Sequence, residues 1–257
     1  MYAKVLFLGL NLYDLFNAAG LLAAMIVFRA LTDQRNVRTS FQRIYFFIAV
    51  IAVALGYLSA ALFQGLYEVL AGRAFTMTKI TFMGGLIGGA FAYLLCTLFT
   101  GKIVIKEEDR AEFFSAFSDI ADVAPCCITI AHGLGRIGCL MGGCCYGKRT
   151  DAWYGVKTPF ETFRVVPLQL FEALFLFALF AALIVLFKKK IHITMPLYLT
   201  AYGVWRFVLE FFRADDRGAT IFSFLTPSQL TSVLAFVLGV VLFLRYFLKR
   251  KRGESRE

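Results

Sequence analysis

Residues His132–Gly147 read HGLGRIGCLMGGCCYG and follow an apolar run that is typical of a membrane helix. This stretch contains one of the chain's two histidines, three of its six cysteines and six glycines. A charged arginine at the end of a membrane span costs roughly a few kcal/mol unless water or an anion meets it. Glycine lets a backbone turn sharply or approach a ligand closely. The stretch therefore predicts a membrane helix that ends in a site where a phosphate-bearing molecule contacts Arg136.

The composition places the whole chain in the membrane. Of its 257 residues, 60% are hydrophobic and only 17% are charged, whereas about half of a soluble domain is apolar. The charged residues lie between apolar runs, so we expect an all-α polytopic membrane protein whose residues 1–257 form a single domain. The net charge of +10 is explained by basic cytoplasmic loops, and no nucleic-acid partner is expected.

Seven apolar runs are each near the roughly 20 residues that cross the hydrocarbon of a bilayer. The predicted spans are Leu10–Leu31, Ile44–Leu66, Ile80–Thr100, Asp119–Leu140, Leu168–Phe187, Met195–Phe212 and Ser228–Leu248.

Lysine and arginine set the predicted orientation. The loops after spans one, three and five, together with the C-terminal tail, hold most of the 27 basic residues. Because basic residues favour the cytoplasmic side, we expect the N-terminus outside and the C-terminus in the cytoplasm. The loop Gly147–Pro167 between spans four and five is then extracytoplasmic, and it is long enough to form a small head.

Polar residues inside predicted spans mark a candidate site. In span four, His132, Arg136 and Cys139 are spaced four and three apart, so they share one helix face. Charged residues at this depth face a cavity or the bundle interior and are usually functional, although a structural salt bridge of Arg136 is an alternative.

Predicted spans five and six also carry polar residues. Gln169 and Glu172 lie three apart at the start of span five, where Glu172 could pair with an arginine or act as a base. Span six carries a polar stripe at spacings of four, four and three. Its members are Tyr202, Arg206, Glu210 and Arg213.

Spans one and three contribute smaller signals. Tyr13 lies among four polar residues near the start of span one, which suggests that this end lines a cavity, although Tyr13 could be only an interfacial aromatic. Gly84 and Gly85 belong to two glycine pairs spaced four apart, for which helix packing is a more common role than ligand contact.

Two arginines on different spans suit an anionic phospholipid. A guanidinium group binds phosphate through two parallel hydrogen bonds and keeps its proton in proteins. Arg136 and Arg206, with acidic and tyrosine neighbours, therefore predict a phosphate-binding site.

Several motifs resemble those of the prolipoprotein diacylglyceryl transferase family. The most specific match is Tyr202–Arg213, which reads YGVWRFVLEFFR. The run Gly135–Gly138 (GRIG) resembles part of the family's core motif, and Gly147 matches its final glycine. Further similar segments are MGGLIG at Met83–Gly88, DVAP at Asp122–Pro125 and PLQLFE at Pro167–Glu172.

The resemblance implies an activity and a location. Phosphatidylglycerol would donate its diacylglyceryl group to the lipobox cysteine thiol of a prolipoprotein at the bacterial inner membrane, which forms a thioether and releases glycerol phosphate. Arg136 and Arg206 would hold the donor phosphate and stabilise the leaving group. The expected catalytic residues are His132, Arg136, Arg206, Tyr13 and Glu172. Further expected substrate contacts are Glu210, Arg213, Tyr202, Gly84, Gly85, Gly138, Cys139 and Gln169.

The chain departs from the family pattern at positions that matter for proton transfer. Met83 stands where the family has a histidine, and Cys139 stands where its core motif has an asparagine. We hypothesise that His132 replaces the missing proton acceptor or orients the acceptor, since an unperturbed pKa near 6.5 suits that role.

Three other readings stay open. The acceptor could differ from a prolipoprotein thiol. A metal site could be formed by His132, Cys139, Cys144 and Cys145, or the cysteines could form a disulfide or redox pair. Because the spacing of these residues matches no common zinc pattern, neither a metal nor a cofactor is expected. The protein could also bind or transport lipid without catalysis, which Met83 would favour.

Overall fold

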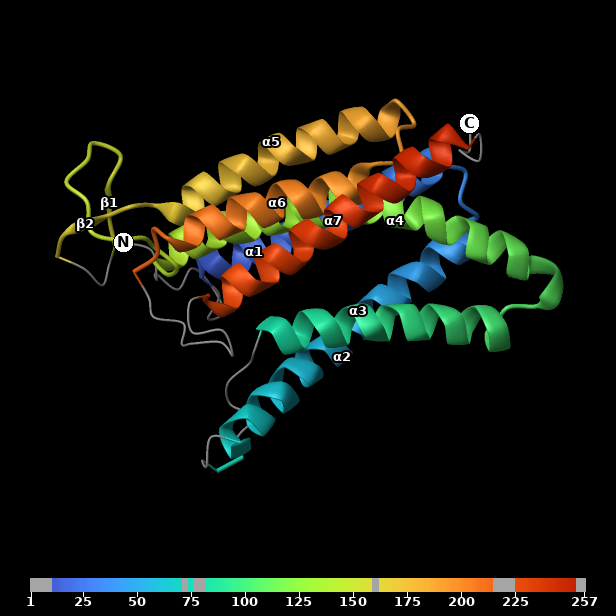
Figure 1. The fold of residues 1–257 in the computed structure, drawn as a ribbon, viewed down its shortest axis with the longest axis horizontal. Helices are drawn as coiled ribbons and strands as arrows, with labels where there is room; N and C mark the ends of the chain where they lie inside the picture. Colours follow the sequence, from blue (N-terminus) through green and yellow to red (C-terminus); the bar gives the residue numbers. More distant parts are fainter. Residues whose placement is uncertain (1–10, 71–73, 76–81, 159–161, 215–224, 253–257) are drawn as a thin grey trace. The chain divides into compact units, whose positions relative to one another are not determined.

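The computed structural model describes residues 11–70, 74–75, 82–158, 162–214 and 225–252 (Figure 1). Within these residues the chain forms seven α-helices, one π-helical turn and two short strands, which confirms the all-α polytopic fold class. The helices are α1 (Leu12–Gln34), α2 (Thr39–Leu70), α3 (Phe82–Phe99), α4 (Glu107–Gly142), α5 (Leu168–Lys188), α6 (Thr194–Glu210) and α7 (Pro227–Lys251); the π-helical turn η1 is Thr100–Val104, and the strands are β1 (Val156–Lys157) and β2 (Arg164–Val165).

Six of the described helices are long and apolar enough to cross a membrane. The remaining helix, α6, has 17 residues, which makes it the shortest of the described α-helices, and it carries Arg206 and Glu210. Large apolar side chains are exposed on the helix surfaces, as expected of segments that face lipid rather than water. The predicted starts of spans one and three, Leu10 and Ile80, lie outside the described residues, and the predicted orientation stays a prediction.

Helix α4 begins earlier than the predicted span. The apolar pattern placed its start at Asp119, but the helix begins at Glu107 and continues through Pro125 to Gly142. Its first turn contains Glu107, Glu108 and Asp109, and acidic residues there stabilise a helix by opposing its dipole. Hydropathy identifies the apolar part of such a helix and misses the charged extension.

The chain divides into two compact units, which we describe separately. The first comprises residues up to Leu31 and from Ala121 onward, and the second comprises Thr32–Ile120. The predicted single domain stays a prediction.

The first unit contains α1, most of α4, and α5, α6 and α7. One core cluster lies at the end of the bundle where α5 finishes, and its buried members are Leu31, Val123, Cys126, Leu179, Leu183 and Phe187. Glycines allow close helix contacts elsewhere: a Cβ built on Gly20 of α1 would lie 2.9 Å from the carbonyl oxygen of Ala131 in α4, and one on Gly203 of α6 would lie 2.9 Å from that of Ser232 in α7.

The opposite end of this unit carries a small head between α4 and α5 (Figure 1). Strands β1 and β2 pair antiparallel, with Val156 opposite Val165. A further bridge joins Gly147 to Arg213, just after α6. The loop predicted to form a head is therefore structured, and it is fastened to the end of α6. We call this region of the first unit the head end.

The second unit contains α2, α3, η1 and the first part of α4. Ser59 of α2 donates a hydrogen bond to the carbonyl oxygen of Gly84 in α3, at 2.9 Å. A Cβ on Gly84 would lie 2.6 Å from Cβ of Phe63, and one on Gly85 would lie 3.3 Å from Cβ of Ala60. Both glycines thus serve the contact between α2 and α3, and their predicted contact with substrate stays a prediction.

Candidate functional site

Glu172 is the centre of a buried polar cluster in the first unit. Its side chain, in the first turns of α5, is 2% exposed. Oε2 lies 3.0 Å from Nε of Arg136 in α4, and Oε1 accepts a hydrogen bond of 2.8 Å from the Tyr202 hydroxyl in α6. Of the two roles considered for Glu172, the structure shows pairing with an arginine, which offsets the cost of burying both charges.

His132 joins this cluster from one turn before Arg136. Nε of Arg136 donates a hydrogen bond of 3.1 Å to Nε2 of His132, and that nitrogen lies 3.8 Å from Oε1 of Glu172. The His132 ring also meets the Tyr202 ring edge to face, with centroids 5.1 Å apart. Because Nε2 accepts from a guanidinium group, the neutral ring carries its proton on Nδ1. The spacing of four thus brings His132 and Arg136 together as predicted.

Arg206 of α6 is held on one side and has a spare donor on the other. Its Nη2 lies 2.8 Å from Oε2 of Glu210 and donates to the Ser228 hydroxyl at 3.1 Å. The residue is 8% exposed, and within the described part of the chain its Nη1 is buried without a hydrogen-bond partner. A buried guanidinium with an unused donor is suited to binding an anion.

The two arginines belong to the same electrostatic environment. Arg136 and Arg206 both interact electrostatically with His132 and with Tyr202. Glu210 is fixed from α7 as well, because the Thr226 hydroxyl donates to its Oε1 at 3.0 Å. Polar residues of α4, α5 and α6 that lie far apart in the sequence therefore converge in this part of the first unit.

Sequence reasoning missed the contribution of α7 to this site. Thr226 caps α7 by accepting from the backbone N–H of Gln229, whose side chain accepts from the Thr226 N–H in return. This capping box was visible as Thr-Pro-Ser-Gln at Thr226–Gln229. The signal locates the start of α7, but it does not reveal that Thr226 and Ser228 reach Glu210 and Arg206.

Tyr13 lies where α1 crosses the end of α4. Its side chain is 39% exposed, and its backbone oxygen accepts from Asn17 Nδ2 at 2.8 Å. A Cβ on Gly138 would lie 3.1 Å from that oxygen, and one on Gly142 would lie 3.5 Å from the Tyr13 ring. Gly138 therefore lets α1 approach α4, and Tyr13 interacts electrostatically with the cysteines beyond Gly138.

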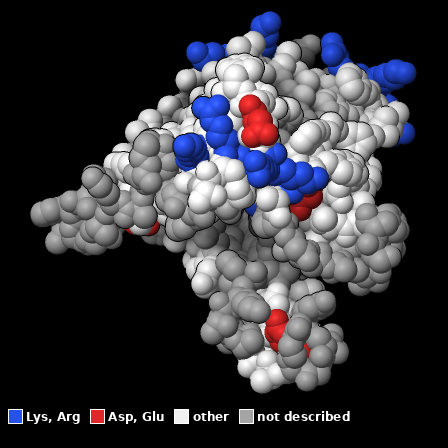
Figure 2. Space-filling view, turned by 90° about the vertical axis from the view of Figure 1, so that its left-hand side faces the viewer, with Lys and Arg blue, Asp and Glu red and all other residues white. Residues whose placement is uncertain are grey.

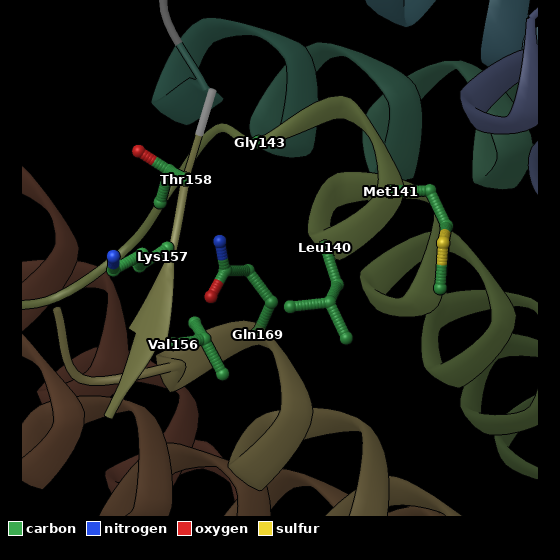
Figure 3. Close-up of a pocket in the computed structure, with 7 residues that line it drawn as sticks. All are labelled: Leu140, Met141, Gly143, Val156, Lys157, Thr158 and Gln169. Atoms are coloured by element: carbon green, nitrogen blue, oxygen red, sulfur yellow. The ribbon is translucent and has the colours of Figure 1, made fainter. Parts of the chain in front are cut away.

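Gln169 links the start of α5 to the loop after α4. Its Nε2 donates to the carbonyl oxygen of Cys144, while Oε1 is buried without a partner among the described residues. The side chain borders a small cavity of about 100 Å³ between β1 and the end of α4, together with Leu140, Val156 and Lys157 (Figure 3). The carbonyl oxygen of Cys144 thus fixes the orientation of the Gln169 side chain, and Oε1 of Gln169 is shielded from bulk water.

The end of α4 gathers three cysteines. The Sγ atoms of Cys139, Cys144 and Cys145 all lie within 4.8 Å of one another, and all three cysteines are free. His132 belongs to the Glu172 cluster and is not part of this group. The four-residue metal site considered from sequence is therefore reduced to its three cysteines.

Arg213 completes the head end. Its side chain is 7% exposed, and it interacts with the thiol of Cys145. Hydrogen bonds from Cys139 and Cys144, and then from Arg213, lower the pKa of Cys145. The thiolate form, which is the nucleophilic and metal-binding form of cysteine, is favoured there.

A wider cavity opens at the head end. Its volume is about 660 Å³, and its lining includes Cys144, Cys145, Arg149, Phe163 and Arg213. Figure 2 shows lysine and arginine side chains gathered on this side of the molecule. The exposed basic residues of the head are Lys148, Arg149, Lys157 and Arg164. The cavity therefore lies in surroundings that attract anions.

Comparison with known proteins places this arrangement in a family. The sequence profile described as prolipoprotein diacylglyceryl transferase matches residues 2–245. Phosphatidylglycerol–prolipoprotein diacylglyceryl transferase of Clostridium tetani is 29% identical over 90% of this chain and 91% of its own length. The enzyme named diacylglyceryl transferase 2 of Clostridium perfringens is 32% identical over 62% of this chain and 59% of its own length. A relative from Francisella tularensis subsp. mediasiatica is 33% identical over 68% of this chain and 63% of its own length.

Proposed function

Because the chain belongs to the prolipoprotein diacylglyceryl transferase family, we propose that it transfers a diacylglyceryl group from phosphatidylglycerol to the lipobox cysteine of a prolipoprotein. The relatives are named for this donor and this acceptor. The resulting product is a thioether, and the leaving group is glycerol phosphate. The described part of the chain contains six helices that are long and apolar enough to cross a membrane, so we further propose that the protein resides in the bacterial inner membrane with its head end outside.

One observation carries the proposal for the donor site. Nη1 of Arg206 is buried in the polar cluster and lacks a partner among the described residues, while its Nη2 is fixed by Glu210 and Ser228. An anchored guanidinium with a free donor is preorganised for a phosphate oxygen. Arg136 acts on the same surroundings and adds a second positive charge.

The chemistry needs charge stabilisation at the phosphate and a thiolate at the acceptor. The thiolate attacks the glycerol carbon of the donor, the bond from that carbon to the phosphate oxygen breaks, and the thiol proton ends on glycerol phosphate. Arginines stabilise the charge that develops on the leaving phosphate. Glu172, which is held between Arg136 and Tyr202, fixes the orientation of Arg136 rather than reacting itself.

His132 keeps its proposed role in proton transfer or orientation. Its Nε2 is occupied by Arg136, so a proton could be accepted there only if that hydrogen bond breaks on substrate binding. Retention of full activity in a folded His132→Ala variant would rule this role out.

The alternative, a lipid-binding protein without catalysis, is not favoured. An anchored Arg206 would serve phospholipid binding with or without catalysis, so the preference rests on the names of the relatives, which describe transferases.

The test is release of glycerol phosphate from phosphatidylglycerol by purified protein, with and without a lipobox peptide. Release that depends on the peptide and falls at least about a hundredfold in Arg206→Gln supports the proposal, since one lost donor to a developing charge costs about that much. Arg245→Gln is the matched control, because Arg245 is exposed near the end of α7. Absence of release from wild type, or equal release in Arg206→Gln, would contradict it.

A further inference from the structure

The end of α4 is built so that two cysteines meet. The backbone N–H of Cys144 donates to the carbonyl oxygen of Cys139 at 3.2 Å, and that of Gly143 donates to Leu140 at 3.2 Å. Gly143 has a positive φ of 68°. These two bonds define a Schellman motif, in which the third residue before the helix cap and the second residue after it lie side by side. The spacing Cys-x4-Cys around a glycine therefore places Cys139 next to Cys144.

The third cysteine is brought in by an unusual backbone conformation. Cys145 has a φ of 64°, in the left-handed region that glycine occupies freely and other residues occupy at a cost in free energy. A residue is kept in such a conformation only when its surroundings determine it. As a result, three sulfur atoms lie within 4.8 Å of one another. A disulfide would need only two of them, whereas a metal site can use all three.

The spacing and charge of this cluster suit a thiophilic cation. A tetrahedral zinc ion holds sulfur at about 2.3 Å, so its sulfur ligands lie about 3.8 Å apart, which small side-chain rotations can reach from the present arrangement. Three thiolates around Zn²⁺ leave one net negative charge. Arg213 contacts Cys145, and Arg136 interacts electrostatically with Cys139 and Cys145, so cations adjoin the cluster.

A site with three protein ligands has an open fourth position. Cys144 and Cys145 line the cavity of about 660 Å³ at the head end, so this position is accessible to a molecule that enters there. Tyr13 at the start of α1 also interacts electrostatically with all three cysteines.

We propose that Cys139, Cys144 and Cys145 bind one zinc ion as thiolates, and that its fourth position takes the thiol of the acceptor peptide. The second half of this proposal rests on the proposed function. A thiol that coordinates zinc loses its proton. The bound thiolate then forms the carbon–sulfur bond, the carbon–oxygen bond to phosphate breaks, and the released glycerol phosphate takes up one proton. This site would remove the thiol proton in place of the acceptor that is lost where Met83 stands, and His132 would then keep only its alternative role of orienting the acceptor.

The first test measures metal content in the full chain, purified in detergent with a phosphine reductant. We expect about one zinc per chain in wild type and in Cys96→Ser, a matched control in α3, and loss of zinc in Cys144→Ser. No zinc in wild type, even after incubation with zinc chloride, would overturn the proposal. A zinc content in Cys144→Ser equal to that of wild type would overturn it too. So would wild-type protein prepared without reductant that lacks metal and has two fewer reactive thiols than the reduced protein.

The second test needs no variant, so it does not depend on the folding of one. Cobalt replaces zinc, and the thiolate-to-cobalt absorption is followed as a lipobox peptide is added. We expect the band to rise by about one third, because four thiolates replace three. A peptide with serine in place of cysteine should leave the band unchanged. An unchanged band with the cysteine peptide would overturn the proposed binding of the acceptor.

Two further outcomes distinguish failure of the zinc proposal from failure of the proposed function. If zinc removal by a chelator leaves peptide-dependent release of glycerol phosphate unchanged, the metal has no role in a reaction that nevertheless occurs. If zinc binds and the cobalt band responds to the peptide, but no diacylglyceryl group is transferred, the site stands and the proposed reaction fails.

Discussion

Nε of Arg136 in α4 lies 3.0 Å from Oε2 of Glu172 in α5, and both side chains are largely buried. The same carboxylate accepts a hydrogen bond from Tyr202 in α6. The Glu172 carboxylate therefore fixes the arginine of the central sequence motif, and its ion pair and hydrogen bond together join α4, α5 and α6.

Glu172→Gln should weaken both stability and turnover. The amide can still accept from Tyr202, but Arg136 is left buried without its counter-charge. Breaking a buried pair in this way costs about 3 to 5 kcal/mol, so the thermal unfolding midpoint in detergent should fall. Glu108→Gln, at an exposed position of α4, should leave the midpoint unchanged. An unaltered midpoint for Glu172→Gln would show that the pair does not hold the bundle.

Gly88→Ala should destabilise the contact between α2 and α3. A Cβ at Gly88 would lie 2.2 Å from Oγ and 2.3 Å from Cβ of Ser59, whereas one at Gly85 would lie 3.3 Å from Ala60. We expect Gly88→Ala to cost about 1 to 3 kcal/mol and Gly85→Ala to cost less, as measured by denaturant unfolding. Adding Ser59→Gly should restore part of the loss, and absence of any rescue would contradict the proposed clash.

Thr226→Ala should destabilise the start of α7 and remove a hydrogen bond that positions Glu210. The substitution removes the acceptor for the Gln229 N–H and the donor to Glu210 Oε1. Loss of a helix N-cap costs about 1 to 2 kcal/mol. We expect a matching fall in stability together with a raised KM for phosphatidylglycerol, because Arg206 depends on Glu210. Thr226→Ser, which keeps both hydrogen bonds, should behave as wild type.

Cys145 should be the first cysteine to react with iodoacetamide in reduced, metal-free protein. Its pKa is lowered by hydrogen bonds from Cys139 and Cys144 and by Arg213. Its thiolate therefore persists at pH values below the usual cysteine pKa of about 8.5. At about pH 6, where an ordinary thiol is protonated, peptide mapping should find the label mainly on Cys145. Arg213→Gln should shift this labelling to higher pH, and labelling of Cys96 at the same rate would contradict the expectation.

Much of the site was predictable because helical periodicity fixes which residues share a face. The spacing of His132 and Arg136 predicted that they share a helix face, and the structure shows them hydrogen-bonded. The Tyr202–Arg213 stripe likewise predicted one face for Arg206 and Glu210, which form an ion pair. The bounds of α5 were predicted to within one residue at each end, because its apolar run stops at a run of lysines.

Other features depend on tertiary contacts that a linear pattern does not encode. The hydrogen bond between Thr226 and Glu210 joins residues 16 apart in the sequence. The bridge between Gly147 and Arg213 fastens the head to the end of α6 and joins residues that lie far apart in the sequence. The convergence of Cys139 and Cys144 could have been found from the glycine between them, whereas the left-handed conformation of Cys145 could not.

The most direct test of the central claim is the mass of a lipobox peptide after incubation with the purified protein and phosphatidylglycerol. We predict that the cysteine peptide gains the mass of one diacylglyceryl group, that a serine peptide gains none, and that Arg206→Gln abolishes the product. An unmodified cysteine peptide, in the presence of intact protein and donor, would contradict the account.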